Sequence, residues 1–332
     1  MESRTLQAMH EIESICEHWS LAAGHMEKLA PLAYVWHPTA LISKHPTKPY
    51  GLTLQAITHG NEVGGLEVLL SLLGMLRSGL LQPQFSLGFA LGNPAAAAED
   101  RRFLERDLNR SFGQSASSSL EEKRARELEP MLEGSQFFLD IHQTIEPSTR
   151  PFFIFPYTVP SFAFAQAISG GVPIVTHWGS SFSKDGMCSD EFVNQRGGVG
   201  ITLELGQKGF NPYHRGVGVL LALAAIEYAG RMLKSRQASR IEARDTEVYT
   251  WKAVVAHFEG AELNEGLYNF QHVSSGETLG RTQDGLLRAQ ESGYLLFPKY
   301  RRDPNAPAPK ELYRIAERIR LDQLGKEGVM RR

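Results

Sequence analysis

The stretch Leu52 to Gly65, LTLQAITHGNEVGG, decides how the rest of the chain is interpreted. It begins as an apolar run that is typical of a buried strand, passes through His59 and Glu62, and leads through two glycines into a leucine-rich segment that predicts a helix. A His and a Glu three residues apart at the end of a strand can place an imidazole nitrogen and a carboxylate on one metal ion. The pattern therefore predicts half of a zinc site.

The spacing His-x-x-Glu is weak evidence when it stands alone. With 11 His and 37 acidic residues among 332, about one such pair is expected by chance. His10 and Glu13 share the spacing, but they lie in an amphipathic run with no strand before it, and we interpret them as a solvated helix face. His59 differs because an apolar strand precedes it and glycines around it let the chain turn sharply.

The composition indicates a globular chain long enough for one large α/β domain and a smaller one, with 42% hydrophobic residues. A net charge of −2, with both signs interspersed, favours neither nucleic acid nor an anionic membrane as a partner. Cys16 and Cys188 belong to no Cys-x-x-Cys motif, and we interpret both as packing residues in a reducing compartment. No signal peptide is recognisable, and the longest apolar run, 217–226, is too short to span a bilayer, which predicts a cytoplasmic protein.

Strands alternating with helices over residues 1–240 predict a mixed, mostly parallel sheet covered by helices. We expect helices over 1–30, a capping box of Ser118 and Glu121 at the start of a helix, and a glycine-rich loop over 179–200. Residues 241–332 have a different pattern of short β segments separated by turns, which predicts a small β-rich C-terminal domain. Its last segment, 311–324, is predicted to be an amphipathic helix.

Polar residues stand at or just beyond four predicted strand ends: His59 with Glu62, the loop 102–110, His142 and Glu204. In open α/β sheets, ligands bind in the crevice at the carboxyl ends of the strands, so these residues are expected to converge. A catalytic zinc takes three protein ligands and leaves one open position, and the two histidines with Glu62 supply that number.

Four motifs, in this order, resemble a known family. Thr58-His-Gly-Asn-Glu62, Arg102-x6-Asn109-Arg110, Asp140-Ile-His142-x-Thr144 and Leu203-Glu204-Leu-Gly are similar to the motif series of the aspartoacylase/succinylglutamate desuccinylase family. This family is a branch of the zinc carboxypeptidase-like amidohydrolases. The resemblance covers about residues 50–300 and implies a zinc carboxypeptidase-like α/β fold. It also implies that the C-terminal β domain is a lid that keeps polypeptides out of the pocket.

The resemblance implies roles for particular residues. Zn²⁺ would be bound by His59, Glu62 and His142, and Glu204 would be the general base for attack of a zinc-activated water on an amide. Arg102 would stabilise the developing oxyanion, and Asn109 and Arg110 would bind a substrate carboxylate. Arg196 and Tyr294 are further substrate-binding candidates, matched less securely to the family pattern. Asp140 would support the metal site, while His177 and Trp178 either line the pocket or only pack.

We therefore predict a zinc-dependent amidohydrolase that deacylates a small N-acyl amino acid, with an N-acetyl or N-succinyl group. A zinc carboxypeptidase that acts on short peptides remains an alternative, because its metal, base and carboxylate clamp would look the same. A non-catalytic binding module on the same scaffold is a second alternative. A homo-oligomer is possible.

Overall fold

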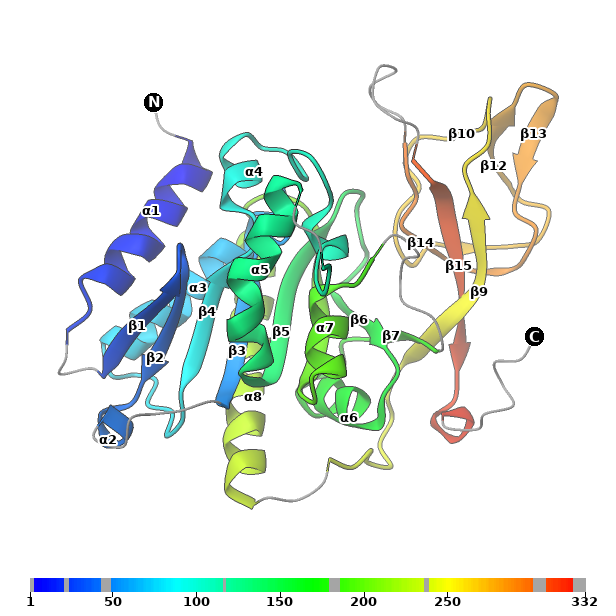
Figure 1. Cartoon of the computed structure of the whole chain (residues 1–332). Coiled ribbons are helices and arrows are strands. Elements are labelled where there is room, and N and C mark those ends of the chain that lie inside the picture. The colour runs from blue at the N-terminus through cyan, green and yellow to red at the C-terminus, as the bar shows by residue number, and fades with distance from the viewer. Residues whose placement is uncertain are drawn as a thin grey trace.

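The computed structural model describes residues 3–20, 24–42, 49–115, 118–178, 186–235, 239–300 and 309–324 (Figure 1). Within these ranges, twelve strands form one sheet. In spatial order they are β1 (His25–Ala30), β2 (Ala33–His37), β4 (Leu87–Leu91), β3 (Tyr50–Ala56), β5 (Ser135–Thr144), β8 (Val199–Gln207), β6 (Phe152–Pro156), β7 (Ile174–His177), β9 (Val248–Ala256), β15 (Glu311–Ile319), β14 (Gly293–Leu296) and β11 (His272–Val273). A second sheet contains β10 (Glu262–Leu263), β12 (Thr278–Thr282) and β13 (Gly285–Arg288).

The central strands β4, β3, β5 and β8 are parallel, and antiparallel pairs extend the sheet on both sides. One face is covered by α1 (Arg4–Glu17), α3 (Gly64–Arg77), α6 (Val159–Ile168) and α8 (Pro212–Ser235). The other face is covered by α5 (Leu120–Glu133) and α7 (Ser189–Gln195). Shorter helical segments are α2 (Thr39–Ile42), α4 (Pro94–Ala98) and single 3₁₀ turns at Leu108–Arg110 and Leu321–Gln323. The predicted α/β fold, a mixed sheet covered by helices, is confirmed.

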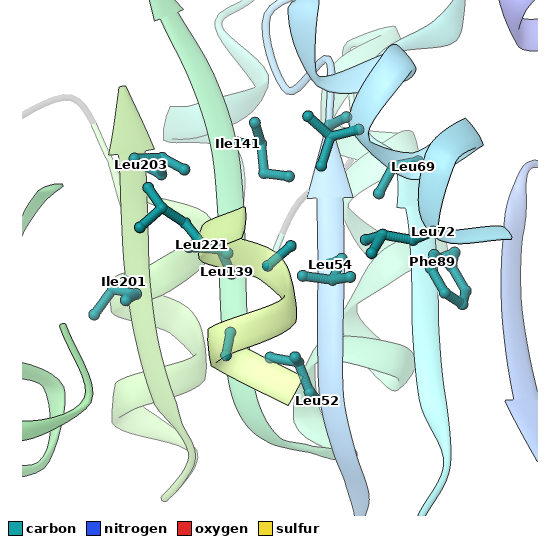
Figure 2. Packing of buried hydrophobic residues seen from close by; sticks show 14 of the residues in the cluster. Leu52, Leu54, Leu69, Leu72, Phe89, Leu139, Ile141, Ile201, Leu203 and Leu221 are labelled. Carbon is teal, nitrogen blue, oxygen red and sulfur yellow. The ribbon is translucent and has the colours of Figure 1, made fainter. Parts of the chain in front are cut away.

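The central strands form a core because apolar side chains from alternate positions reach the helices on one face. Leu54 of β3 packs in the same cluster as Leu72 of α3 and Leu221 of α8 (Figure 2). Each such side chain removed from water contributes roughly 1.5–3 kcal/mol to folding. Among the described helices, α8 alone has the length and apolar composition to cross a bilayer. Part of its apolar surface is buried against α3 and the sheet, as in a core helix.

Two segments predicted to be helical are strands instead. Residues 25–30 form β1, which pairs with β2 at the edge of the sheet, and residues 311–319 form β15, which lies between β9 and β14. The sequence of β15 has apolar positions at helical spacing, but hydrogen bonding to strands on both sides outweighs that local preference. The sheet therefore continues into the C-terminal region through β9, which is parallel to β7.

Two local details also differ from the predictions. The capping box of α5 is formed by Ser119 and Glu122, one residue later than expected, because Glu121 turns inward to accept the backbone N–H groups of 104–106. The predicted loop 179–200 contains the helix α7. Its first part, 179–185, lies outside the described residues.

Replacing Leu54 by alanine is expected to lower the free energy of unfolding by about 2–5 kcal/mol, because the side chain is fully buried and the cavity cannot close. The matched change Leu220→Ala on α8, where the side chain is 68% exposed, is expected to cost less than about 0.5 kcal/mol. Urea denaturation of both variants measures the difference. Similar costs for the two would contradict the assigned core.

Candidate active site

The turn that follows β3 places His59 and Glu62. Ile57, the residue after β3, has a φ of +51°, which a β-branched residue rarely adopts. The carbonyl of Ile57 accepts a hydrogen bond from the backbone N–H of Asn93 at 2.8 Å, so the loop after β4 holds this conformation. Backbone strain of this kind persists where the surrounding structure fixes it, and it is concentrated at functional sites.

Gly60 joins this turn to the loop that carries Arg102. Its N–H donates to the carbonyl of Arg102 at 3.1 Å. A Cβ at this position would lie 2.3 Å from the backbone nitrogen of Ala97 and 2.6 Å from the carbonyl oxygen of Arg101. Only glycine allows so close an approach, and this contact brings Arg102 beside His59 and Glu62.

His59, Glu62 and His142 form one buried cluster whose potential ligand atoms all lie within 4.8 Å of one another. The Nδ1 atom of His59 is 2.8 Å from Oε1 of Glu62, and Nδ1 of His142 is 2.9 Å from Oε2 of the same carboxylate. A tetrahedral zinc site with ligands at about 2.0–2.2 Å needs ligand atoms about 3–3.5 Å apart. The donor set therefore fits Zn²⁺, and the three side chains are close enough to reach one ion after small shifts.

The second ring nitrogen of each histidine faces another carboxylate. Nε2 of His59 is 3.1 Å from Oδ1 of Asp107, and Nε2 of His142 is 3.1 Å from Oδ2 of Asp140. Carboxylates in this position fix the orientation of metal-binding imidazoles and raise their basicity. The family resemblance implies this role for Asp140 but not for Asp107, although Asp107 stands two residues before Asn109 in the same motif.

The electrostatics of the cluster suit a cation. Burial acts to raise the pKa of Glu62, but the two histidines hold it well below its ordinary value. Burial acts to lower the pKa of His142, yet the neighbouring carboxylates of Asp140 and Glu62 raise it well above the ordinary range. The site thus concentrates negative charge around two imidazoles, which is the environment that a divalent metal ion neutralises.

Glu204 lies beside this cluster. β8 is paired in parallel with β5 so that Glu204 stands opposite His142. Its Oε2 atom is buried and has no hydrogen-bond partner among the described residues. Burial, and then the charge of Glu62, raise its pKa to about 8. A carboxylate in this environment can accept a proton at neutral pH and hold it for transfer.

Arg102 contacts the cluster from the loop side. Its Nη1 donates to Oε1 of Glu62 at 3.0 Å, and its Nη2 lies 2.7 Å from Nε2 of His59. The guanidinium is about one third exposed and lines the cavity, so it can also contact a bound molecule. A fixed positive charge here can stabilise an oxyanion.

The cluster opens into a cavity of about 850 Å³. Its cationic lining residues are Arg102, Arg106, Arg110, Lys299, Lys310 and Arg314. The last three come from the C-terminal region, and none of them was predicted from the sequence, which indicated a helix for the segment that contains Arg314. Lys299 Nζ lies 3.7 Å from Oε2 of Glu311. Its pKa is lowered by burial, against the effect of Glu311, and further by the charges of Arg102 and Arg314.

Two predicted substrate-binding residues are not brought to the cavity. Arg196 lies at the surface, with Nε 3.4 Å from Glu133 and its guanidinium over the ring of Phe192. Tyr294 on β14 packs its ring against those of Tyr249 and His272. Neither side chain lines the cavity.

His177 and Trp178, which either line the pocket or only pack, have different surroundings in the structure. His177 lines the cavity, whereas Trp178 stacks on Tyr157 with the ring centroids 5.1 Å apart. Both cysteines are buried as expected, although Cys188 also lines the cavity.

Amide hydrolases are the class of enzyme to which this fold and this chemistry belong, and the comparisons with known proteins agree. Residues 50–215 match the model of the succinylglutamate desuccinylase/aspartoacylase catalytic domain. The chain belongs to the succinylglutamate desuccinylase/aspartoacylase family, whose members deacylate N-acyl amino acids.

The relatives cover most of the chain. The succinylglutamate desuccinylase of Serratia proteamaculans is 30% identical in an alignment 296 residues long, which covers 81% of this chain and 86% of that protein. The structure of succinylglutamate desuccinylase from Vibrio parahaemolyticus has a TM-score of 0.66 at 16% identity and covers 93% of this chain and 95% of its own. Murine aminoacylase 3 has a TM-score of 0.62 at 21% identity and covers 82% of this chain and 97% of its own.

Replacing Gly60 by alanine is expected to destabilise the protein by about 1–3 kcal/mol and to weaken zinc binding, because the new Cβ would push the 96–101 backbone away from His59 and Glu62. Gly74→Ala is the matched control. Its Cβ in α3 would meet nothing within 4 Å, and the change should stabilise the helix by about 1 kcal/mol. Thermal unfolding and zinc titration check both variants. Zinc binding equal to wild type in Gly60→Ala would contradict the assigned turn.

Proposed function

We propose that the protein is a zinc-dependent, cytoplasmic amidohydrolase that removes a short acyl group from the amino nitrogen of an acidic N-acyl amino acid. The observation that carries the proposal is the free, buried Oε2 of Glu204 beside a His–Glu–His cluster at the carboxyl ends of β3, β5 and β8. The names of the relatives, succinylglutamate desuccinylase and aminoacylase, support the substrate class.

Zinc held by His59, Glu62 and His142 would act as a Lewis acid that lowers the pKa of a water molecule to about 7. Glu204 takes the proton from the attacking water and hands it to the leaving amine, which requires a carboxylate whose pKa lies near the working pH. Arg102 stabilises the negative charge that develops on the amide oxygen.

Six cationic residues line the cavity among seven acidic ones, and we propose that the cationic side chains, rather than a net positive charge, bind the carboxylates of the substrate. Arg110 lines the cavity from the loop 102–110. Lys299, Lys310 and Arg314 line it from the C-terminal region. A charge-assisted hydrogen bond to one of these groups contributes about 1.5–3 kcal/mol. An N-succinyl group carries a carboxylate that an N-acetyl group lacks, so we favour succinyl as the acyl group.

Glu204→Gln is expected to lower kcat by about 10²–10⁴-fold and to leave zinc binding intact, because the amide cannot accept the proton but does not remove a metal ligand. Metal analysis of the purified variant and a released-amine assay measure the two effects. Glu133→Gln, at the exposed partner of Arg196, is the control and should match wild type. Retained hydrolysis in Glu204→Gln would reject the assigned base. Wild type that folds and binds no zinc would favour a non-catalytic binding module.

An N-succinyl amino acid is expected to show a kcat/KM about 10–100-fold above that of the N-acetyl derivative of the same amino acid, because it adds one ionic hydrogen bond. Tripeptides should not be hydrolysed if the C-terminal region, whose residues line part of the cavity, acts as the lid that the family resemblance implies. Comparing these three substrates under one assay tests both points. Efficient turnover of tripeptides would favour the carboxypeptidase alternative.

A further inference from the structure

The segment that leads into α7 packs closely along the Asn109–Phe112 segment. Met187 forms a β-bridge with Phe112. Gly186 has a φ of +150°, and a Cβ there would lie 2.0 Å from the carbonyl oxygen of Arg110. This approach requires glycine, so the two backbones are in contact where Arg110 enters the cavity.

Ser189 forms hydrogen bonds with Asn109, on the loop that carries Arg110, and with Asp140, which lies beside His142. Its backbone N–H donates to Oδ1 of Asn109 at 2.9 Å, and its hydroxyl donates to Oδ2 of Asp140 at 2.5 Å. Both Ser189 and Asp140 are fully buried, so these bonds do not compete with water. Oδ2 of Asp140 lies 3.1 Å from Nε2 of His142 and also accepts from the hydroxyl of Thr58, so Ser189 is one of two hydroxyl groups that hold this carboxylate beside the proposed metal-binding cluster.

Cys188 contacts the substrate side of the site. Nη1 of Arg110 donates to Sγ of Cys188 at 3.0 Å. The same nitrogen donates to the carbonyl of Asn109, its own neighbour in the chain. A thiol sulfur is a weak acceptor, but here it is buried and contacts the guanidinium where that group lines the cavity.

We propose that Ser189 and Cys188 are positioning residues that keep the carboxylate-binding arginine in register with the metal-binding histidine. Ser189 acts on the metal side through Asp140 and His142, and Cys188 acts on the substrate side through Arg110. The inference rests on the proposed function for the roles of His142 and Arg110. It also changes the role of Asn109, whose side-chain oxygen accepts from Ser189 and so holds the loop in place.

Plain packing is the competing explanation, and it makes a different prediction. If the two side chains only filled space, their truncation would lower stability and would affect metal and substrate binding together. Positioning through separate contacts instead predicts that two adjacent residues affect two different measured quantities.

The experiment compares Ser189→Ala, Cys188→Ala and the control Ser161→Ala in the full-length protein. Ser161 is also a buried serine in contact with α7, but its hydroxyl donates to Asn194 at the far end of that helix. Zinc dissociation constants by chelator competition, kcat and KM at saturating zinc, and urea denaturation are measured for each variant.

Ser189→Ala is expected to weaken zinc binding by about 10–100-fold while KM stays near wild type, because alanine keeps the backbone N–H that holds Asn109. Cys188→Ala is expected to raise KM by about 3–10-fold without changing the zinc dissociation constant. Cys188→Ser, which keeps an acceptor, should recover part of that KM. Ser161→Ala should change neither quantity.

Unchanged zinc affinity in Ser189→Ala, or parallel changes of zinc affinity and KM in both variants, would overturn the inference. These outcomes differ from failure of the proposed function, which would appear as a wild-type protein that binds no zinc or hydrolyses no N-acyl amino acid. A Ser161→Ala variant with the same loss of zinc affinity as Ser189→Ala would also count against positioning.

Discussion

The site is organised by one buried carboxylate. Glu62 lies between two imidazoles, 2.8 Å from His59 and 2.9 Å from His142, and it also accepts the backbone N–H of Gln143 at 3.1 Å. A buried charge of this kind is costly unless it is paired and hydrogen-bonded, so its partners must be held in place by the surrounding chain. Much of the local structure serves that requirement, including the strained turn at Ile57, the close contact at Gly60 and the outer carboxylates Asp107 and Asp140.

The loop that carries the arginines is fixed from outside the site. Glu121, buried at the start of α5, accepts the backbone N–H groups of Leu104, Glu105 and Arg106. An irregular loop lacks the repeated backbone hydrogen bonds of a helix or strand. A buried carboxylate that accepts several backbone N–H groups supplies such bonds and fixes the conformation of the loop. The loop can therefore present Arg102 and Arg110 to the cavity from fixed positions, as preorganised electrostatic stabilisation requires.

The C-terminal region is part of the same sheet and of the same cavity. β9 runs beside β7, and Arg150 and Glu247 form a bidentate ion pair near this junction. β15 then brings Glu311 and Arg314 to the cavity, and Lys299 precedes it. The cationic side chains that line the cavity thus come from two parts of the chain that are joined by continuous hydrogen bonding. This continuity limits how far the C-terminal strands can move relative to His59, Glu62 and His142.

The sequence by itself determined the features that are encoded locally. The apolar strands and amphipathic helices predicted the α/β sheet, and short motifs with fixed spacing identified His59, Glu62, His142 and Glu204 at strand ends. Only the tertiary structure decided the features that depend on contacts between residues far apart in the sequence. β15 is a strand because β9 and β14 bind it on both sides, although its own sequence has a helical period. Arg196 lies outside the cavity, Lys299 and Arg314 line it, and Ser189 contacts Asp140 beside the cluster, because contacts between residues remote in sequence leave no fixed spacing to recognise.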